Sequence, residues 1–168
     1  RQVVKYLRQV VNLINDNSLY RKDTVEGVNY VYIKGSQYQG NGKDRIKNLL
    51  EFAYRLPKVC KHFQKPDAIV STSFDPISCY QGIRIAKKYN VKAIAEIADL
   101  WPETPVAYGM FKANSPIVKG LRVLEKKIYK EADAVIFTIE GAYDYILEQG
   151  WEKDIPRNKV FHINNGVD

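Results

Sequence analysis

The chain contains few of the residues that metal centres and disulfide frameworks require. Its 168 residues include two cysteines and two histidines, without metal-ligand spacing. Cys60 and Cys79 therefore predict two ordinary reduced thiols in a cytoplasmic protein. We expect no metal site, because the acidic residues have no histidine partner and do not cluster beyond Asp99 and Glu103.

Long hydrophobic runs are also absent, since no apolar stretch approaches the roughly 18 residues that suggest a transmembrane helix. Hydrophobic residues make up 45% of the chain and charged residues 27%, as in an ordinary soluble globular protein. The length suits one domain with a single sizeable core.

The formal net charge of +7 admits three interpretations. Nucleic-acid binding is the least favoured, because no helix-turn-helix, zinc-finger or RNP-like motif accompanies the basic residues. An enzyme that works at an anionic membrane surface would carry a similar excess. For any single lysine, a place on a solvated helix face is the simplest interpretation.

Hydrophobic periodicity predicts helices that alternate with strands. The predicted helices cover residues 3–15, 44–63 (kinked or divided at Pro57), 76–89, 116 onward and 141–149, and the predicted strands cover residues 28–34, 67–70, 92–98, 133–138 and 160–163. Because the strands are apolar throughout, we predict an α/β fold with a Rossmann-like, doubly wound, mostly parallel sheet and helices on both faces.

Local capping signals support three of these helix boundaries. Asp75 and Ser115 each precede a proline, which is the pattern of an N-cap followed by the first helical residue. Gly150 suits the position after a helix C-terminus. For the helix that begins after Ser115, the spacing predicts a buried stripe of Ile117, Leu121, Leu124 and Ile128.

The strand that ends at Ala98 runs directly into Asp99-Leu100-Trp101-Pro102-Glu103. In open α/β sheets, ligands bind beyond the carboxyl ends of the strands. Asp99, Trp101 and Glu103 are therefore candidates for holding a polar, ring-shaped ligand. The alternative is a structural loop, in which Asp99 caps a turn or helix and Trp101 packs on the core.

Polar residues also follow the two neighbouring strands. Ser71, Thr72 and Ser73 end one strand, where their hydroxyls either contact a ligand or cap the strand end. Thr138, Glu140 and Gly141 follow another strand, at a helix N-terminus suited to an anion. Capping of that helix by Thr138 is the alternative.

Four stretches carry a family pattern in order and at consistent spacing. They are residues 38–56 (with Tyr-Gln-Gly-Asn-Gly-Lys-Asp-Arg), residues 66–73, residues 99–125 (with Asp-Leu-Trp-Pro-Glu-Thr), and residues 132–135 together with the terminal Asn-Gly-Val-Asp. From about residue 25 onward, the chain resembles the N-terminal half of family 4 glycosyltransferases, the retaining GT-B enzymes of surface-polysaccharide and lipopolysaccharide synthesis. The Asp-Leu-Trp-Pro-Glu run resembles the branch that transfers aminosugars of the fucosamine or N-acetylglucosamine type.

The resemblance implies the acceptor-binding half of an enzyme that transfers a sugar from a nucleotide-sugar donor to a saccharide, expected to be lipid-linked. Transfer in this family is metal-independent, so no cofactor is expected beside the donor substrate. Asp99 and Glu103 are then the catalytic candidates, which accept hydrogen bonds from acceptor hydroxyls, and Trp101 packs against a sugar face. The neighbouring candidates at 71–73 and 138–141 would bind substrate.

We expect residues 1–163 to form one glycosyltransferase N-terminal-like domain, of which residues 1–24 have no match to the family pattern. Residues 164–168, with Asn165 and Gly166, would begin the hinge to a C-terminal nucleotide-sugar domain that this chain lacks. The chain alone is therefore expected to be inactive. We expect a cytoplasmic localisation, and peripheral association with the inner face of the cell membrane is a second expectation.

Other functions are left open by the sequence. A non-catalytic module that binds an acceptor or partner, and pairs with a separate nucleotide-binding chain, is the main alternative. A sugar-nucleotide epimerase of the same overall fold is less favoured, because its carboxylate and histidine pattern is not evident.

Overall fold

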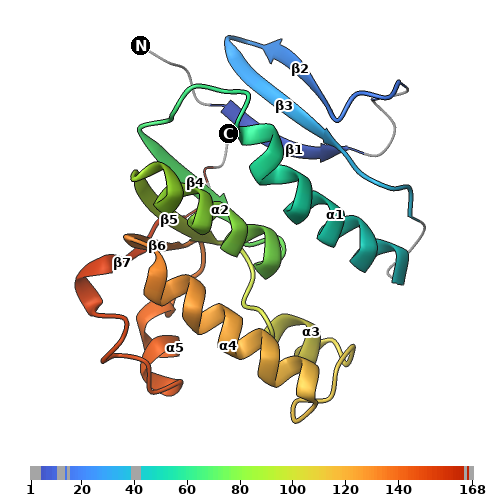
Figure 1. The fold of residues 1–168 in the computed structure, drawn as a ribbon. Coiled ribbons are helices and arrows are strands. Elements are labelled where there is room, and N and C mark those ends of the chain that lie inside the picture. Colours follow the sequence, from blue (N-terminus) through green and yellow to red (C-terminus); the bar gives the residue numbers. More distant parts are fainter. Residues whose placement is uncertain (1–4, 11–13, 15, 39–42, 165, 167–168) are drawn as a thin grey trace. The chain divides into compact units, whose positions relative to one another are not determined.

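The computed structural model describes residues 5–10, 14, 16–38, 43–164 and 166. The chain divides into two compact units, residues 1–64 and 65–168, each with its own sheet (Figure 1). The single domain expected over residues 1–163 stays a prediction.

The first unit contains a three-stranded sheet and one long helix. Its elements are β1 (Lys5–Val10), β2 (Tyr20–Val25), β3 (Val28–Lys34) and α1 (Lys43–Cys60). Strands β2 and β3 form an antiparallel hairpin around Glu26 and Gly27, which both have positive φ (51° and 80°), as a two-residue type I′ turn requires. Helix α1 continues through Pro57, so the predicted division of this helix is wrong.

The segment at residues 5–10 is a strand, so the helix predicted over residues 3–15 is wrong where the structure describes it. Strand β1 pairs in parallel with β3, with Lys5 opposite Asn29 and Val10 opposite Lys34. Tyrosine and valine, as at Tyr6 and Val10, are residue types that favour strands. Pairing with β3 therefore overrides a helical spacing that rests on only a few apolar residues.

The second unit contains a four-stranded parallel sheet in the order β4-β5-β6-β7. Its elements are β4 (Ala68–Thr72), α2 (Pro76–Tyr89), β5 (Lys92–Ile97), α3 (Glu103–Ala107), α4 (Pro116–Glu131), β6 (Ala134–Phe137), α5 (Ala142–Glu148), a 3₁₀ turn (Arg157–Lys159) and β7 (Val160–His162). The α/β fold with a parallel sheet flanked by helices is thus confirmed. Helix α3 and the 3₁₀ turn were not predicted.

One core joins α2, α4 and α5 to the same face of this sheet. Alternate residues of β5, such as Ala95 and Ile97, are fully buried and belong to the same cluster as Ile83, Ile128 and Ile146 of the three helices. This arrangement follows from the strand order, since right-handed crossovers that all advance in one direction place their helices on one face.

The predicted helix boundaries hold, but one predicted stripe is rotated. Side chains of Asp75 and Ser115 accept hydrogen bonds from backbone N–H groups three residues later, as N-caps do, and Gly150 has a φ of +66°. In α4, Ile128 is buried and Leu124 packs against the core as predicted, whereas Ile117 is exposed and Val118 and Glu125 are buried. The buried face of α4 therefore lies about one residue further along the chain than the apolar spacing suggested.

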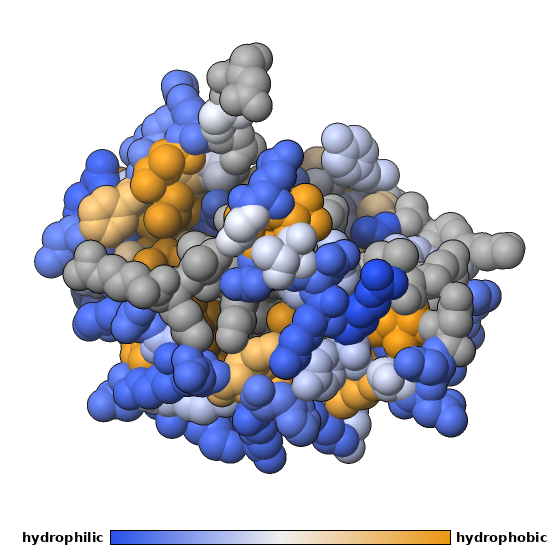
Figure 2. All heavy atoms as spheres, turned by 90° about the horizontal axis from the view of Figure 1, so that it is seen from above, coloured by the Kyte–Doolittle hydropathy of each residue, from blue (hydrophilic) through white to orange (hydrophobic). Residues whose placement is uncertain are grey.

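None of the described helices combines the length and the apolar character that crossing a bilayer needs. On the face of the molecule shown in Figure 2, hydrophilic side chains predominate and apolar ones are scattered among them.

Candidate functional site

Three polar loops meet at the carboxyl edge of the second sheet. They follow β4, β5 and β6, which are adjacent and parallel. Backbone hydrogen bonds join them: the Ser73 N–H donates to the Glu96 carbonyl (2.8 Å), and the Thr138 N–H donates to the Ile97 carbonyl (3.1 Å). The structure thus brings the predicted residues of the three strand ends to one edge.

Asp99 occupies the middle loop and is exposed. Its backbone carbonyl accepts a hydrogen bond from Ser73 Oγ (3.4 Å), whereas its carboxylate has no hydrogen-bond or ion-pair partner among the residues that the structure describes. The capping alternative is not supported, because Pro102 occupies the N-cap position of α3 and no side chain caps that helix. The carboxylate of Asp99 is available to a ligand.

Glu103 begins α3 and forms an ion pair with Arg122 of α4. Arg122 Nη2 donates a hydrogen bond to the Glu103 carboxylate. Both side chains are about one-third exposed. The hydrogen bond to Glu103 raises the pKa of the Arg122 guanidinium. The ion pair therefore fastens Glu103 to α4.

Trp101 lies between these two acids. Its side chain is half-buried, while Leu100 packs against the core cluster and Pro102 is buried. Trp101 itself is not part of that cluster within the described residues. Core packing is therefore not the whole role of Trp101, and part of its ring surface remains accessible.

The three hydroxyl residues at the end of β4 have different surroundings. Ser71 is buried under α2, where its carbonyl accepts a hydrogen bond from Cys79 Sγ (3.4 Å). Thr72 Oγ1 donates to the Glu96 carboxylate (2.5 Å) on β5. Ser73 Oγ donates to the backbone carbonyl of Asp99 (3.4 Å). Ser73 is itself buried (5% exposed, against 9% for Ser71), and Thr72 is the more accessible of the three residues, so a contact of these hydroxyls with substrate stays a prediction.

The residues after β6 do not cap the following helix through a side chain. Gly141 is the N-cap of α5 with a φ of +76°, and Thr138 Oγ1 donates instead to the Ile97 carbonyl (3.4 Å). The alternative in which Thr138 caps α5 is therefore wrong. Glu140 and Gly141 are exposed, and they immediately precede α5, a helix of seven residues.

Sequence reasoning missed a buried polar cluster behind these loops. Glu125 of α4 is 2% exposed, and its carboxylate accepts hydrogen bonds from Tyr129 Oη (2.7 Å) and Tyr145 Oη (2.8 Å). Burial raises the pKa of the Glu125 carboxyl to about 8. The available signal was a glutamate with a tyrosine four residues later, on one face of a helix.

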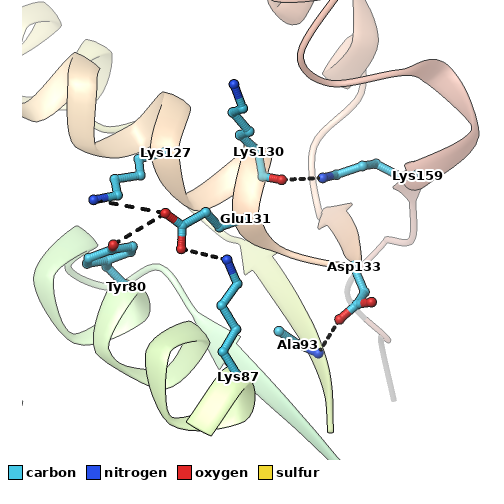
Figure 3. Close-up of polar contacts among 8 residues, drawn as sticks. All are labelled: Tyr80, Lys87, Ala93, Lys127, Lys130, Glu131, Asp133 and Lys159. Atoms are coloured by element: carbon cyan, nitrogen blue, oxygen red, sulfur yellow. Dashed lines mark hydrogen bonds and ion pairs between the residues drawn. The ribbon is translucent and has the colours of Figure 1, made fainter. Parts of the chain in front are cut away.

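Residues 131–133, at the junction of α4 and β6, have a structural role, shown in Figure 3. Asp133 Oδ2 accepts a hydrogen bond from the backbone N–H of Ala93 (2.9 Å) and so fastens the start of β5. Glu131 pairs with Lys87 (2.8 Å) of α2. These contacts lie at the amino edge of the sheet, opposite the candidate site, and explain the Ala132-Asp133 pattern by packing of the fold.

Metal-binding groups are not assembled within the part of the chain that the structure describes, where no three His, Cys, Asp or Glu side chains are placed to hold an ion. Metal-independent chemistry stays a prediction. Cys60 and Cys79 are free thiols, and burial raises the pKa of Cys60 to about 11 and that of Cys79 to about 12. Of the predicted hinge, Gly166 is exposed and Asn165 lies outside the described residues.

The family model of glycosyltransferase family 4 matches residues 15–168, which is most of the chain. The chain belongs to glycosyltransferase family 4. Membership supports a glycosyltransferase role and agrees with the α/β fold. A comparison with curated proteins found no match. In this glycosyltransferase domain, the three-loop edge with Asp99 is the candidate site for a sugar substrate.

Proposed function

We propose that this chain is the acceptor-binding half of a retaining, GT-B type glycosyltransferase. The enzyme would transfer a sugar from a nucleotide-sugar donor to a lipid-linked saccharide in surface-polysaccharide or lipopolysaccharide synthesis. Family membership supports the transferase role. The observation that carries the acceptor role is the exposed Asp99 carboxylate, without a partner among the described residues, where three strand ends meet.

Sugar transfer needs an acceptor hydroxyl held in line with the departing nucleotide. Orientation and preorganised electrostatics supply most of the rate gain in such reactions. Asp99 accepts the hydrogen bond of the acceptor hydroxyl in this proposal, while Ser73 holds the Asp99 backbone. The accessible part of Trp101 covers a sugar face. Glu103, held by Arg122, offers a second carboxylate for the acceptor.

The donor side belongs, in this proposal, to a nucleotide-sugar domain joined through the hinge at residues 164–168. No metal takes part. The donor sugar is an aminosugar of the fucosamine or N-acetylglucosamine type, as the Asp-Leu-Trp-Pro-Glu run suggests.

The proposal is tested with the full-length natural protein, a panel of nucleotide-activated N-acetylhexosamines and a membrane extract that contains lipid-linked saccharides. We expect a product heavier by one aminosugar, detected by mass spectrometry, and no product from residues 1–168 alone. Turnover by residues 1–168 alone would contradict the division of labour. Acceptor binding by the full-length protein without any transfer would favour a non-catalytic binding module.

Peripheral contact with the inner face of the cell membrane is part of the proposal and has support in residues 104–124. This segment contains Lys112, Lys119 and Arg122 but no aspartate or glutamate. Tyr108 is 80% exposed and Ile117 is 58% exposed. Lys112 and Lys119 are exposed and have no acidic partner among the described residues. Basic and apolar side chains together are what an anionic lipid surface attracts.

Vesicle co-sedimentation tests this contact. We expect residues 1–168 to bind phosphatidylglycerol-containing vesicles more tightly than phosphatidylcholine vesicles, and the double variant Lys112→Ala, Lys119→Ala to lose most of the difference. The control replaces Lys88 and Lys153, which are equally exposed elsewhere in the same unit. Equal affinity for neutral and anionic vesicles would argue against an electrostatic membrane contact.

A further inference from the structure

The buried carboxylate of Glu125 connects α4 to the helix that follows one loop of the candidate site. Its two oxygens accept hydrogen bonds from Tyr129 Oη and Tyr145 Oη. Tyr145 lies in α5, which begins directly after Gly141. Glu125 is therefore tied to the element that carries the 138–141 loop.

A second link joins the same part of α4 to the Asp99 loop. Arg122 lies three residues before Glu125, a spacing at which helix side chains are neighbours. Its Nη2 donates to Glu103, the first residue of α3. Arg122 Nε is buried and has no hydrogen-bond partner within the described residues. An unsatisfied buried donor of this kind costs free energy, so Arg122 has an unused capacity for a second acceptor.

Four helices contribute the groups that face this cluster. Arg122 and Tyr129 come from α4, Tyr145 from α5 and Glu103 from α3. Cys79 of α2 contributes to raising the pKa of Tyr129. Burial raises the pKa of Glu125 most, the two tyrosine hydrogen bonds and Arg122 lower it, and Glu103 raises it. The pKa of each tyrosine is also raised, so both remain hydrogen-bond donors while Glu125 titrates.

We propose that Glu125 is a positioning residue of the acceptor site: when it loses its proton to solvent, it attracts the Arg122 guanidinium and so changes how Arg122 holds Glu103 and the Asp99–Glu103 loop. While Glu125 is neutral, Arg122 serves Glu103 alone and the loop is held. Once Glu125 is ionised, the guanidinium faces two carboxylates and its free Nε gains an acceptor. This inference rests on the proposed function in one respect: it takes the Asp99–Glu103 loop to be the part of the chain that binds the acceptor.

The two tryptophans of the chain provide separate reporters. Trp101 lies within the loop, two residues before Glu103. Trp151 packs on Tyr129 and Tyr145, with ring centroids 6.1 and 6.0 Å apart, and so reports on Glu125 itself. Trp151→Phe leaves only Trp101, and Trp101→Phe leaves only Trp151. We expect the fluorescence of each single-tryptophan protein to titrate with a midpoint near pH 8.

Two substitutions separate the ionisation from its transmission. Glu125→Gln should abolish both titrations. Glu103→Gln should abolish the titration of Trp101 and keep that of Trp151, because it removes the charge through which Arg122 pairs with the loop and leaves Glu125 in place. Tyr129→Phe should move both midpoints to higher pH, since it removes a hydrogen bond that favours the ionised carboxyl.

The inference is overturned if Trp101 does not titrate between pH 6.5 and 9.5, or if its titration persists in Glu125→Gln or Glu103→Gln. Should Glu125→Gln fail to fold, Glu103→Gln still tests the inference, because only the Trp101 titration should disappear in that variant. These measurements use neither donor nor acceptor. A negative result therefore leaves the glycosyltransferase role untouched, and a failure of the Asp99 assay leaves the titration standing.

Discussion

A methyl group on Gly82 of α2 would lie 1.9 Å from Oγ of Ser71 in β4. Helix and strand approach so closely at this point that only glycine fits without a shift. Ser71 is consequently enclosed by α2, although it ends the strand that leads into the candidate site. The contact sets the distance between α2 and β4.

Gly82→Ala should therefore destabilise the fold by about 1–3 kcal/mol, the usual cost of overpacking. Gly120→Ala is the matched control, because an added Cβ there meets nothing within 4 Å in the middle of α4 and should stabilise by about 0.5–1 kcal/mol. Denaturant unfolding measures both. Adding Ser71→Ala to Gly82→Ala should recover part of the loss, and equal effects of the two alanines would contradict the packing argument.

Asp133→Asn should lower the free energy of unfolding by about 1 kcal/mol near neutral pH, since it weakens the acceptor for the Ala93 N–H and for Lys92 Nζ (2.8 Å). Both contacts lower the pKa of the Asp133 carboxyl. Its stabilisation is therefore present above the unfolded-state pKa and is lost as pH falls, so variant and wild type should converge in acid. Asp67→Asn, an exposed carboxylate at the same edge, should change little.

The Glu125 carboxyl makes stability depend on pH in the opposite direction. Because its pKa is raised from 4.5 to about 8 in the fold, the unfolded chain releases this proton first as pH rises. The free energy of unfolding should then fall by up to about 1.4 kcal/mol per pH unit between roughly pH 5 and 8, and level off above. Glu125→Gln should remove that slope in chemical denaturation at several pH values. An unchanged slope would show that Glu125 ionises at its ordinary pKa.

Apart from α3 and the 3₁₀ turn, the helices and strands of the second unit were predictable because their signals are local. Asp75 and Ser115 each place a capping side chain before a proline, and the structure has the helices beginning there. The position of Asp99 was predictable from topology alone, since parallel strands bring their carboxyl ends to one edge.

The missed features depend on contacts between distant parts of the chain. Residues 5–10 are a strand because β3 lies beside them, which apolar spacing alone does not reveal. Glu125 is buried because tyrosines on two helices donate to it, and only Tyr129, four residues later on the same helix, was visible as a neighbour in the sequence. The pairing of Glu103 with Arg122 likewise joins residues 19 positions apart.

The central claim is that the Asp99 carboxylate contacts the acceptor, and sugar transfer by the full-length natural protein tests it most directly. Asp99→Asn should reduce kcat/KM at least about tenfold, as expected for loss of a charged hydrogen-bond acceptor at the reacting hydroxyl, with no change in the unfolding midpoint. Asp67→Asn should keep normal activity. Near-normal turnover by folded Asp99→Asn would contradict the account.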